Sequence, residues 1–385
     1  MKNLFKIHFD ESRVFGLDVL RFVAIISVVL GHGLIYLPKS TIGILSYFIF
    51  DGVTIFFVLS GFLVGGILIK ILNEGSFTFN KLLDFWKRRW FRTIPAYFLV
   101  LLLLLVLNIL FNDSFVFNYN IIKYFFFIQN FKTPHPYFFP EAWSLSVEEW
   151  FYLISPIMVF CLTNIFKLST MKAVLITILS IITVTTSYRA YRLLFNIIVT
   201  DINVWDSYYR KQVITRLDSL MYGVLAAYIK FYYTNFFRKY RKDFFILGIF
   251  LSIIQYYFIT FGSDVFYDSV FNFSLLSIST MFMIPLLDSI KTAPKIILIP
   301  VTYVSLTSYS MYLVNYSVVQ IWIIDNIDFL KNAPTLNTGV TFSIYLIFVM
   351  ILSILMYKYF EIPTTKLRDR PIRNHTKNVK NITMR

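Results

Sequence analysis

Long apolar stretches alternate with short polar segments along most of the chain, and this pattern predicts membrane-spanning helices. About 18 apolar residues are enough for a helix to cross a bilayer. The stretches lack the strict polar–apolar alternation that is typical of membrane β-barrel strands. We therefore predict an all-α polytopic membrane protein with about ten transmembrane helices, at 14–37, 44–71, 93–111, 148–167, 172–188, 215–233, 243–261, 270–289, 300–324 and 339–360.

The composition supports the same fold class. Of the 385 residues, 57% are hydrophobic and 15% are charged, whereas a soluble domain has about 45–50% apolar and about 25% charged residues. An aromatic content of 19% excludes a disordered chain. We expect a transmembrane domain at 14–362, between a cytoplasmic segment at 1–13 and a basic cytoplasmic tail at 363–385. The apolar run 121–131 is too short to cross the bilayer, and we interpret it as an interfacial or re-entrant segment.

The net charge of +15 reflects topology rather than nucleic-acid binding. Lys and Arg are enriched in the cytoplasmic loops of membrane proteins. If the N-terminus is cytoplasmic, most of the 36 Lys and Arg residues fall in cytoplasmic segments. An even number of spans then places the C-terminus on the same side. We expect a multi-pass protein of the cell membrane that contacts lipids, has both termini in the cytoplasm and has no nucleic-acid partner.

The first predicted span carries three ionisable residues, Asp18, Arg21 and His32. At 100° per residue, Arg21 and His32 share one face of the helix, and Asp18 lies one turn before Arg21. Ionisable groups at membrane depth normally face the protein interior or a wet cavity. Asp18 and Arg21 suit either a structural ion pair or a substrate contact. His32 lies between Gly31 and Gly33, which leave room for a ligand, and it is our candidate general base.

Polar residues near the ends of the second and third spans are further candidates. Asp51 lies at a depth comparable to that of His32, where it would orient the imidazole or sit at the interface. Arg89 and Arg92 precede the third span on the predicted cytoplasmic side. Such residues either anchor lipid headgroups or offer fork-shaped donors to the phosphates of a ligand.

The segment EAWSLSVEEWFYLISP opens the fourth predicted span on the outer side. Its acidic residues suit the start of a helix, where the helix dipole favours negative charge. Acids beside aromatic residues also suit the mouth of a substrate site, and Glu148 and Trp143 are our candidates there. Arg216 lies at the outer start of the sixth span, and we expect it to help shape the same mouth.

Several catalytic motifs are absent from the chain. It has no Walker-type phosphate loop, no GxSxG sequence and no HExxH sequence, and we expect no metal. The single cysteine, Cys161, excludes a disulfide within the chain. His32 is the only histidine within a predicted span.

From about residue 14 to 368, the sequence resembles the membrane acyltransferase family 3. The family's arginine and histidine, separated by ten residues, match Arg21 and His32, and its RxxR motif matches Arg89 and Arg92. Its FFxLSGFL and WSLSVEEqFY segments appear as FFVLSGFL at 56–63 and WSLSVEEWFY at 143–152, and TRLDSLMYGVLAA at 215–227 also follows the family pattern.

Two positions depart from the family pattern. Thr54 stands where the family usually has an aspartate, with Asp51 one turn earlier. Asn315 stands where the ninth span often has a histidine. We interpret Asn315 as a residue that packs helices together, with no part in proton transfer.

Members of this family move acyl groups from a cytoplasmic thioester onto carbohydrate hydroxyls. The resemblance implies an O-acyltransferase that uses acetyl-CoA as donor and a surface polysaccharide, or its lipid-linked precursor, as acceptor. Arg89 and Arg92 would bind the donor, Glu148 and Arg216 would help to shape the acceptor mouth, Asp51 would orient His32, and His32 would act as general base or carry the acyl group.

Two other classes of function remain open from the residues alone. A transporter or proton-coupled permease for a small polar substrate would use Asp18, Arg21, His32 and Asp51 as its path. Inverted repeats with interrupted helices would favour a transporter, and the sequence has neither feature. The departures at Thr54 and Asn315 also leave open a binding or scaffold protein that has lost its activity.

Overall fold

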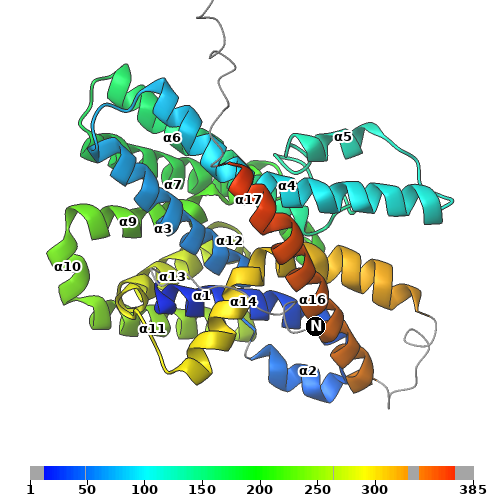
Figure 1. The fold of residues 1–385 in the computed structure, drawn as a ribbon. Coiled ribbons are helices and arrows are strands. Elements are labelled where there is room, and N and C mark those ends of the chain that lie inside the picture. Colours follow the sequence, from blue (N-terminus) through cyan, green and yellow to red (C-terminus); the bar gives the residue numbers. More distant parts are fainter. Residues whose placement is uncertain (1–12, 48, 263, 328–337, 369–385) are drawn as a thin grey trace, which may run out of the picture.

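The computed structural model describes residues 13–47, 49–262, 264–327 and 338–368. Within these ranges all regular structure is helical (Figure 1). The predicted N-terminal segment at 1–13 and the tail beyond 368 lie almost entirely outside the described residues. The first half of the chain contains α1 (Phe15–Gly33), η1 (Leu34–Tyr36), α2 (Lys39–Ser46), α3 (Gly52–Asn73), α4 (Phe79–Phe111), α5 (Tyr119–Phe125), α6 (Ala142–Asn164) and α7 (Thr170–Phe195).

The second half continues with short helices and then with longer ones. Its elements are α8 (Ile202–Trp205), η2 (Asp206–Arg210), η3 (Val213–Thr215), α9 (Leu217–Tyr232), α10 (Thr234–Lys239), α11 (Arg241–Phe261), α12 (Val265–Val270), α13 (Asn272–Ser289), α14 (Lys295–Val314), η4 (Asn315–Ile323), η5 (Ile324–Asn326), α16 (Thr338–Met356), η7 (Tyr357–Glu361) and α17 (Ile362–Leu367).

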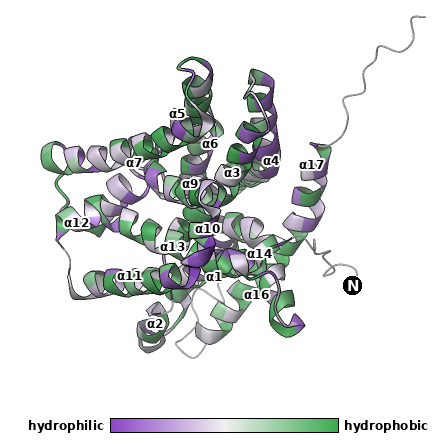
Figure 2. Ribbon diagram, turned by 90° about the vertical axis from the view of Figure 1, so that its left-hand side faces the viewer, coloured by the Kyte–Doolittle hydropathy of each residue, from purple (hydrophilic) through white to green (hydrophobic). Residues whose placement is uncertain are grey.

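Seven helical segments of the described chain are long and apolar enough to cross a membrane. They are Phe15–Tyr36, Gly52–Asn73, Phe79–Phe111, Ala142–Asn164, Thr170–Phe195, Lys295–Asn326 and Gly339–Leu367. Figure 2 shows that apolar residues dominate along the long helices. The other three predicted spans correspond to α9, α11 and α13; α9, for example, has only 16 residues. The protein is thus an all-helical, multi-pass membrane protein.

Three predicted boundaries were wrong. The second span begins at Gly52 rather than at 44, because the Asp51 carboxylate accepts a hydrogen bond from Thr54 N (3.3 Å) and caps α3. The third helix begins at Phe79, so the basic cluster of Lys87, Arg88, Arg89 and Arg92 lies inside α4. The fourth helix begins at Ala142, so Glu148 lies almost two turns within α6 and does not cap it. The only helix that overlaps the run 121–131 is the seven-residue α5, which is too short to cross a bilayer.

Helices α3 and α9 are locked together by a reciprocal pair of glycines. A Cβ on Gly61 would lie 1.9 Å from Leu220 O, and a Cβ on Gly223 would lie 2.0 Å from Val58 O. Gly65 similarly faces Val224. Small residues four apart, such as Gly61 and Gly65, are typical of close packing between membrane helices.

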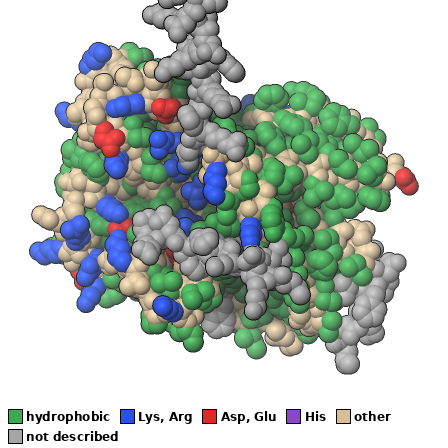
Figure 3. Space-filling model, viewed as in Figure 1, with side chains coloured by type: hydrophobic (Ala, Val, Ile, Leu, Met, Phe, Trp, Pro, Cys, Tyr) green, Lys and Arg blue, Asp and Glu red, His purple; other side chains and the backbone are tan. Residues whose placement is uncertain are grey.

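Basic and apolar side chains occupy different parts of the surface. Figure 3 shows Lys and Arg gathered over the left and centre of one face and apolar side chains over its right side, where α4 and α5 lie.

Candidate functional site

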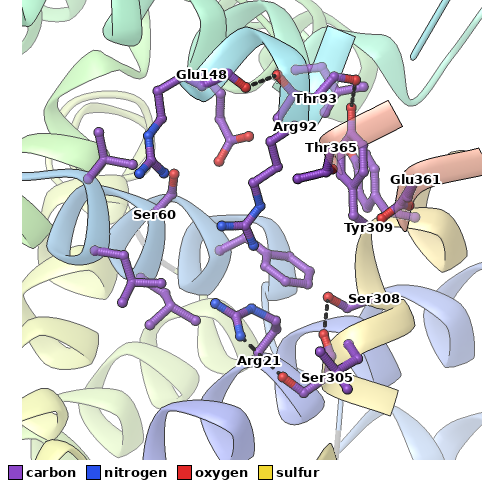
Figure 4. Close-up of a pocket in the computed structure, with 18 of the residues that line it drawn as sticks. Arg21, Ser60, Arg92, Thr93, Glu148, Ser305, Ser308, Tyr309, Glu361 and Thr365 are labelled. Atoms are coloured by element: carbon purple, nitrogen blue, oxygen red, sulfur yellow. Dashed lines mark hydrogen bonds between the residues drawn. The ribbon is translucent and has the colours of Figure 1, made fainter. Parts of the chain in front are cut away.

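A cavity of about 590 Å³ lies between α1, α3, α4, α6, α14 and the C-terminal helix α17. Figure 4 shows the side chains of Arg21, Arg92 and Glu148 pointing into it from three different helices. Basic residues dominate its charged lining: Arg13, Arg21, Arg89, Arg92, Lys366 and Arg368 face two acids, Glu148 and Glu361. The excess of positive charge suits a ligand that carries several negative charges.

Asp18 and Arg21 form an ion pair in the structure, which is one of the two alternatives that the sequence left open. The buried Asp18 carboxylate accepts hydrogen bonds from Arg21 Nη1 (3.3 Å) and from Ser305 Oγ (2.7 Å). Arg13, which the sequence analysis did not single out, also pairs with Asp18. These bonds join the start of α1 to α14, so Asp18 holds both arginines at the edge of the cavity.

Glu148 lies in the same cavity as Arg89 and Arg92. The predicted topology places this acid and these arginines on opposite sides of the membrane. The early start of α6 moves Glu148 deeper into the bundle. Next to it, the carboxylate of Glu149 is buried and accepts a hydrogen bond from Thr93 Oγ1 (2.7 Å).

The C-terminal helix completes the cavity. Glu361 accepts a hydrogen bond from Ser310 Oγ on α14. Thr365, Lys366 and Arg368 line the cavity beyond it. The predicted boundary at 362 had separated these residues from the transmembrane domain. Their basic, polar sequence is typical of a tail, and only the packing of α17 against α4 reveals their position.

His32 lies at the opposite end of α1 from the cavity, and its partner is Asn315. The distance between His32 Nδ1 and Asn315 Oδ1 is 2.5 Å. The ring of Tyr316 packs against the imidazole with 4.7 Å between the ring centroids. Tyr345 of α16 donates a hydrogen bond to Val29 O (3.1 Å) and holds this end of α1 in place.

Asp51 does not hydrogen-bond to His32 among the interactions of the described residues. Its carboxylate accepts a hydrogen bond from Thr54 Oγ1 (2.8 Å) and lies 4.0 Å from Arg210 Nη2. Burial opposes ionisation of Asp51, but Arg210, Arg216 and the hydrogen bonds from Thr54 together lower its pKa. Asp51 is therefore an anion held by arginines.

Arg216 is fully buried, whereas the sequence analysis expected it at an outer mouth. Its Nη2 donates to Thr54 Oγ1 (2.5 Å), and its guanidinium lies 4.2 Å from the centroid of Phe273. Thr54 thus connects Arg216 to Asp51 at the position where the family pattern has an acid. These contacts join α3, α9 and α13.

Trp143 is buried, and the guanidinium of Arg210 lies 5.4 Å from its ring centroid. Arg210 also pairs with Asp206 (3.0 Å) and was missed by the sequence analysis, since its loop has no periodic pattern. It brings Trp143 and Asp51 into one cluster.

Glu141, also missed, bonds to η4, the segment that begins at Asn315, the partner of His32. Its buried carboxylate accepts from Ser317 N (3.1 Å) and Ser317 Oγ (2.5 Å). Burial, opposed by these bonds from Ser317, raises the pKa of Glu141 to about 7. The acid is the first residue of the EAWSLSVEEW segment, and its place at the start of a buried helix was the available signal.

Tyr312 connects the lining of the cavity to the His32 region. Tyr312 and Ser144 line the cavity, and their hydroxyls lie 2.6 Å apart. Tyr312 also donates to Glu141 O (3.1 Å), while its own carbonyl accepts from Asn315 Nδ2 (2.8 Å). One turn of helix thus connects the cavity wall to the partner of His32.

In the part of the chain that the structure describes, no group of three or more His, Cys, Asp and Glu side chains is arranged to hold a metal ion.

Comparison with known proteins identifies relatives of one kind. A family model described as "Acyltransferase domain" matches residues 14–358. The O-acetyltransferase OatA of Staphylococcus aureus is 27% identical over 326 residues, which cover 79% of this chain and 50% of that protein. A putative O-acetyltransferase of S. aureus strain COL is 28% identical over the same shares of both chains.

A further relative is the peptidoglycan O-acetyltransferase OatA of Listeria monocytogenes. It is 31% identical over 163 residues, which cover 38% of this chain and 24% of that protein. The chain matches half the length or less of these curated relatives. No solved structure matches the chain.

Proposed function

Because the chain belongs to this acyltransferase family, we propose that it transfers an acetyl group from acetyl-CoA to a hydroxyl of a surface polysaccharide or of its lipid-linked precursor. The relatives support acetyl as the acyl group, and the name of the listerial relative supports a cell-wall glycan as acceptor. The donor would enter from the cytoplasm, with both termini on that side of the cell membrane.

The observation that carries this proposal is the excess of guanidinium groups in the cavity. Coenzyme A carries phosphate groups, and arginine binds phosphate through paired, charge-assisted hydrogen bonds. Arg89 supports this use, because its Nε is buried and makes no hydrogen bond within the described structure. Arg92 and Arg21 reach into the same space (Figure 4).

His32, at the opposite end of α1 from the cavity, is the proposed general base. It would take the proton of the acceptor hydroxyl as that oxygen attacks the acetyl carbonyl carbon. The carbon–sulfur bond of the thioester then breaks, the coenzyme leaves as a thiolate, and the proton passes from His32 to that sulfur. An acyl-histidine intermediate is the alternative, in which His32 itself receives the acetyl group first.

The test is acetyl transfer by membranes that contain the protein. With acetyl-CoA labelled in its acetyl group and a cell-wall glycan as acceptor, we expect label in the glycan. We expect His32→Ala at equal protein level to abolish this transfer. Unchanged glycan acetylation in the His32→Ala membranes, or uptake of glycan without any acyl donor, would contradict the proposal.

A further inference from the structure

Asn315 is placed where it can control the chemistry of His32. It is completely buried and is the first residue of η4, a π-helical segment that continues α14. Such π-helical turns are rare and occur frequently at functional sites. This one places the side chains of two consecutive residues, Asn315 and Tyr316, against the imidazole of His32.

The orientation of the Asn315 amide follows from its other partners. Nδ2 lies 2.9 Å from Met311 O and 2.8 Å from Tyr312 O. Both partners are carbonyl oxygens, which only accept hydrogen bonds, so the amide group that faces them must be the NH₂. A flipped amide would turn its oxygen toward two carbonyls and lose both bonds.

This orientation determines the proton on His32. The amide oxygen of Asn315 faces Nδ1 at 2.5 Å and can only accept. Nδ1 must therefore carry a hydrogen, and in the neutral ring Nε2 has the free lone pair. In histidine, the hydrogen bond made by one ring nitrogen decides the protonation of the other.

We propose that Asn315 is a positioning residue that holds His32 in the Nδ1–H tautomer, so that Nε2 is the atom that takes the proton from the acceptor hydroxyl. The inference rests on the proposed function. During transfer, the Nδ1–H donates to Asn315 throughout, while Nε2 gains the hydroxyl proton and later releases it to the coenzyme sulfur. No proton passes to Asn315.

Two substitutions separate this role from a purely structural one. Asn315→Asp and Asn315→Leu both lose the NH₂ group that bonds Met311 O and Tyr312 O. Only Asn315→Asp keeps an oxygen that accepts from His32 Nδ1. We expect Asn315→Leu to lower kcat by about 100-fold or more, the contribution of a well-placed general base, with the KM for acetyl-CoA unchanged.

We expect Asn315→Asp to keep a kcat within about tenfold of wild type, because the acceptor remains. Equal loss in the two variants would show that the amide acts only through its backbone bonds and would overturn the proposal. A kcat of Asn315→Leu close to that of wild type would also overturn it.

A spectroscopic measurement tests the tautomer without any substrate. The full-length protein, labelled with ¹⁵N at its four histidines, gives ring nitrogen signals, and His32→Ala identifies those of His32. We expect a protonated Nδ1 and an unprotonated Nε2 in wild type and in Asn315→Asp, and loss of this preference in Asn315→Leu. An Nε2–H tautomer in wild type overturns the proposal, and this result stands even if the protein transfers no acetyl group.

Discussion

The two ends of α1 are built in opposite ways. Around Arg21, charged side chains from α1, α4 and α17 surround a wide cavity, and most of the charge is of one sign. Around His32, uncharged groups make close contacts: an amide and a tyrosine ring contact the imidazole, and a second tyrosine donates its hydroxyl hydrogen to the backbone of the same helix. The first arrangement suits binding of an anion, whereas the second suits precise control of one proton. Substitutions at the two ends should therefore affect different kinetic constants.

The largest effect is expected for His32→Gln. The amide of glutamine cannot act as a base, so kcat should fall by about 100-fold to 10,000-fold. The KM for acetyl-CoA should stay unchanged, because His32 does not line the cavity. Steady-state kinetics in detergent or nanodiscs would measure both constants. A raised KM with an unchanged kcat would mean that His32 contributes to donor binding rather than to proton transfer.

Arg92→Ala should have the opposite signature. Loss of a charge-assisted hydrogen bond of about 1.5–3 kcal/mol should raise the KM for acetyl-CoA about tenfold to 100-fold with little change in kcat. In wild type, added salt should raise the same KM, since ions screen the phosphate contacts. Lys87→Ala is the matched control, because Lys87 belongs to the same basic cluster but is exposed and outside the cavity. The same rise in KM for Lys87→Ala would point to a general surface effect.

Tyr312→Phe tests whether the hydrogen bonds of Tyr312 keep the cavity closed toward the His32 region. It removes the hydrogen bonds to Ser144 and to Glu141 O, each worth about 1 kcal/mol. The cavity should then open more readily, and hydrolysis of acetyl-CoA without acceptor should rise about threefold to tenfold. Tyr303→Phe on the same helix is the control, since its buried hydroxyl makes no hydrogen bond within the described structure. Hydrolysis unchanged in Tyr312→Phe would exclude this role of Tyr312.

The smallest effect concerns Glu141 and the dependence of stability on pH. Its pKa is about 7 in the folded protein and about 4.3 in an unfolded chain. The folded state thus binds more protons between these values, so stability falls as pH rises from about 4.3 to 7 and is level above. We expect the melting temperature of wild type to drop by a few degrees between pH 5 and 8.

Glu141→Gln should reduce this drop, because glutamine is neutral at every pH in the range. Differential scanning fluorimetry would measure the two curves. Glu74→Gln is the control, since Glu74 is exposed on the surface and should leave the drop intact. A wild-type curve that rises with pH would contradict an acid that is protonated in the fold.

Those parts of the site that lie within one segment were predictable from the sequence. Asp18 and Arg21 stand out against an apolar helix, and a spacing of three residues is enough to pair them. His32 was found in the same way. The reciprocal glycine contact at Gly61 was also readable, because small residues four apart mark helix packing.

Contacts between distant segments were not predictable. Nothing local connects His32 to Asn315, 283 residues later, and the departure of Asn315 from the family pattern even argued against a role near the base. Glu148 was assigned to the wrong region because its helix begins earlier than its apolar stretch. The burial of Arg216 depends on Thr54 and Phe273, which belong to two other helices.

The unbroken course of α1 from Phe15 to Gly33 has a consequence for the choice of donor. Arg21 and His32 are eleven residues apart on one uninterrupted helix, which separates them by about 16 Å at 1.5 Å per residue. In the proposed reaction, a donor held by its phosphates at one end must carry its acyl group across this length to reach the base. The distance between the two residues therefore sets a minimum length for the donor, and thioesters with a shorter arm than that of coenzyme A should bind without reacting.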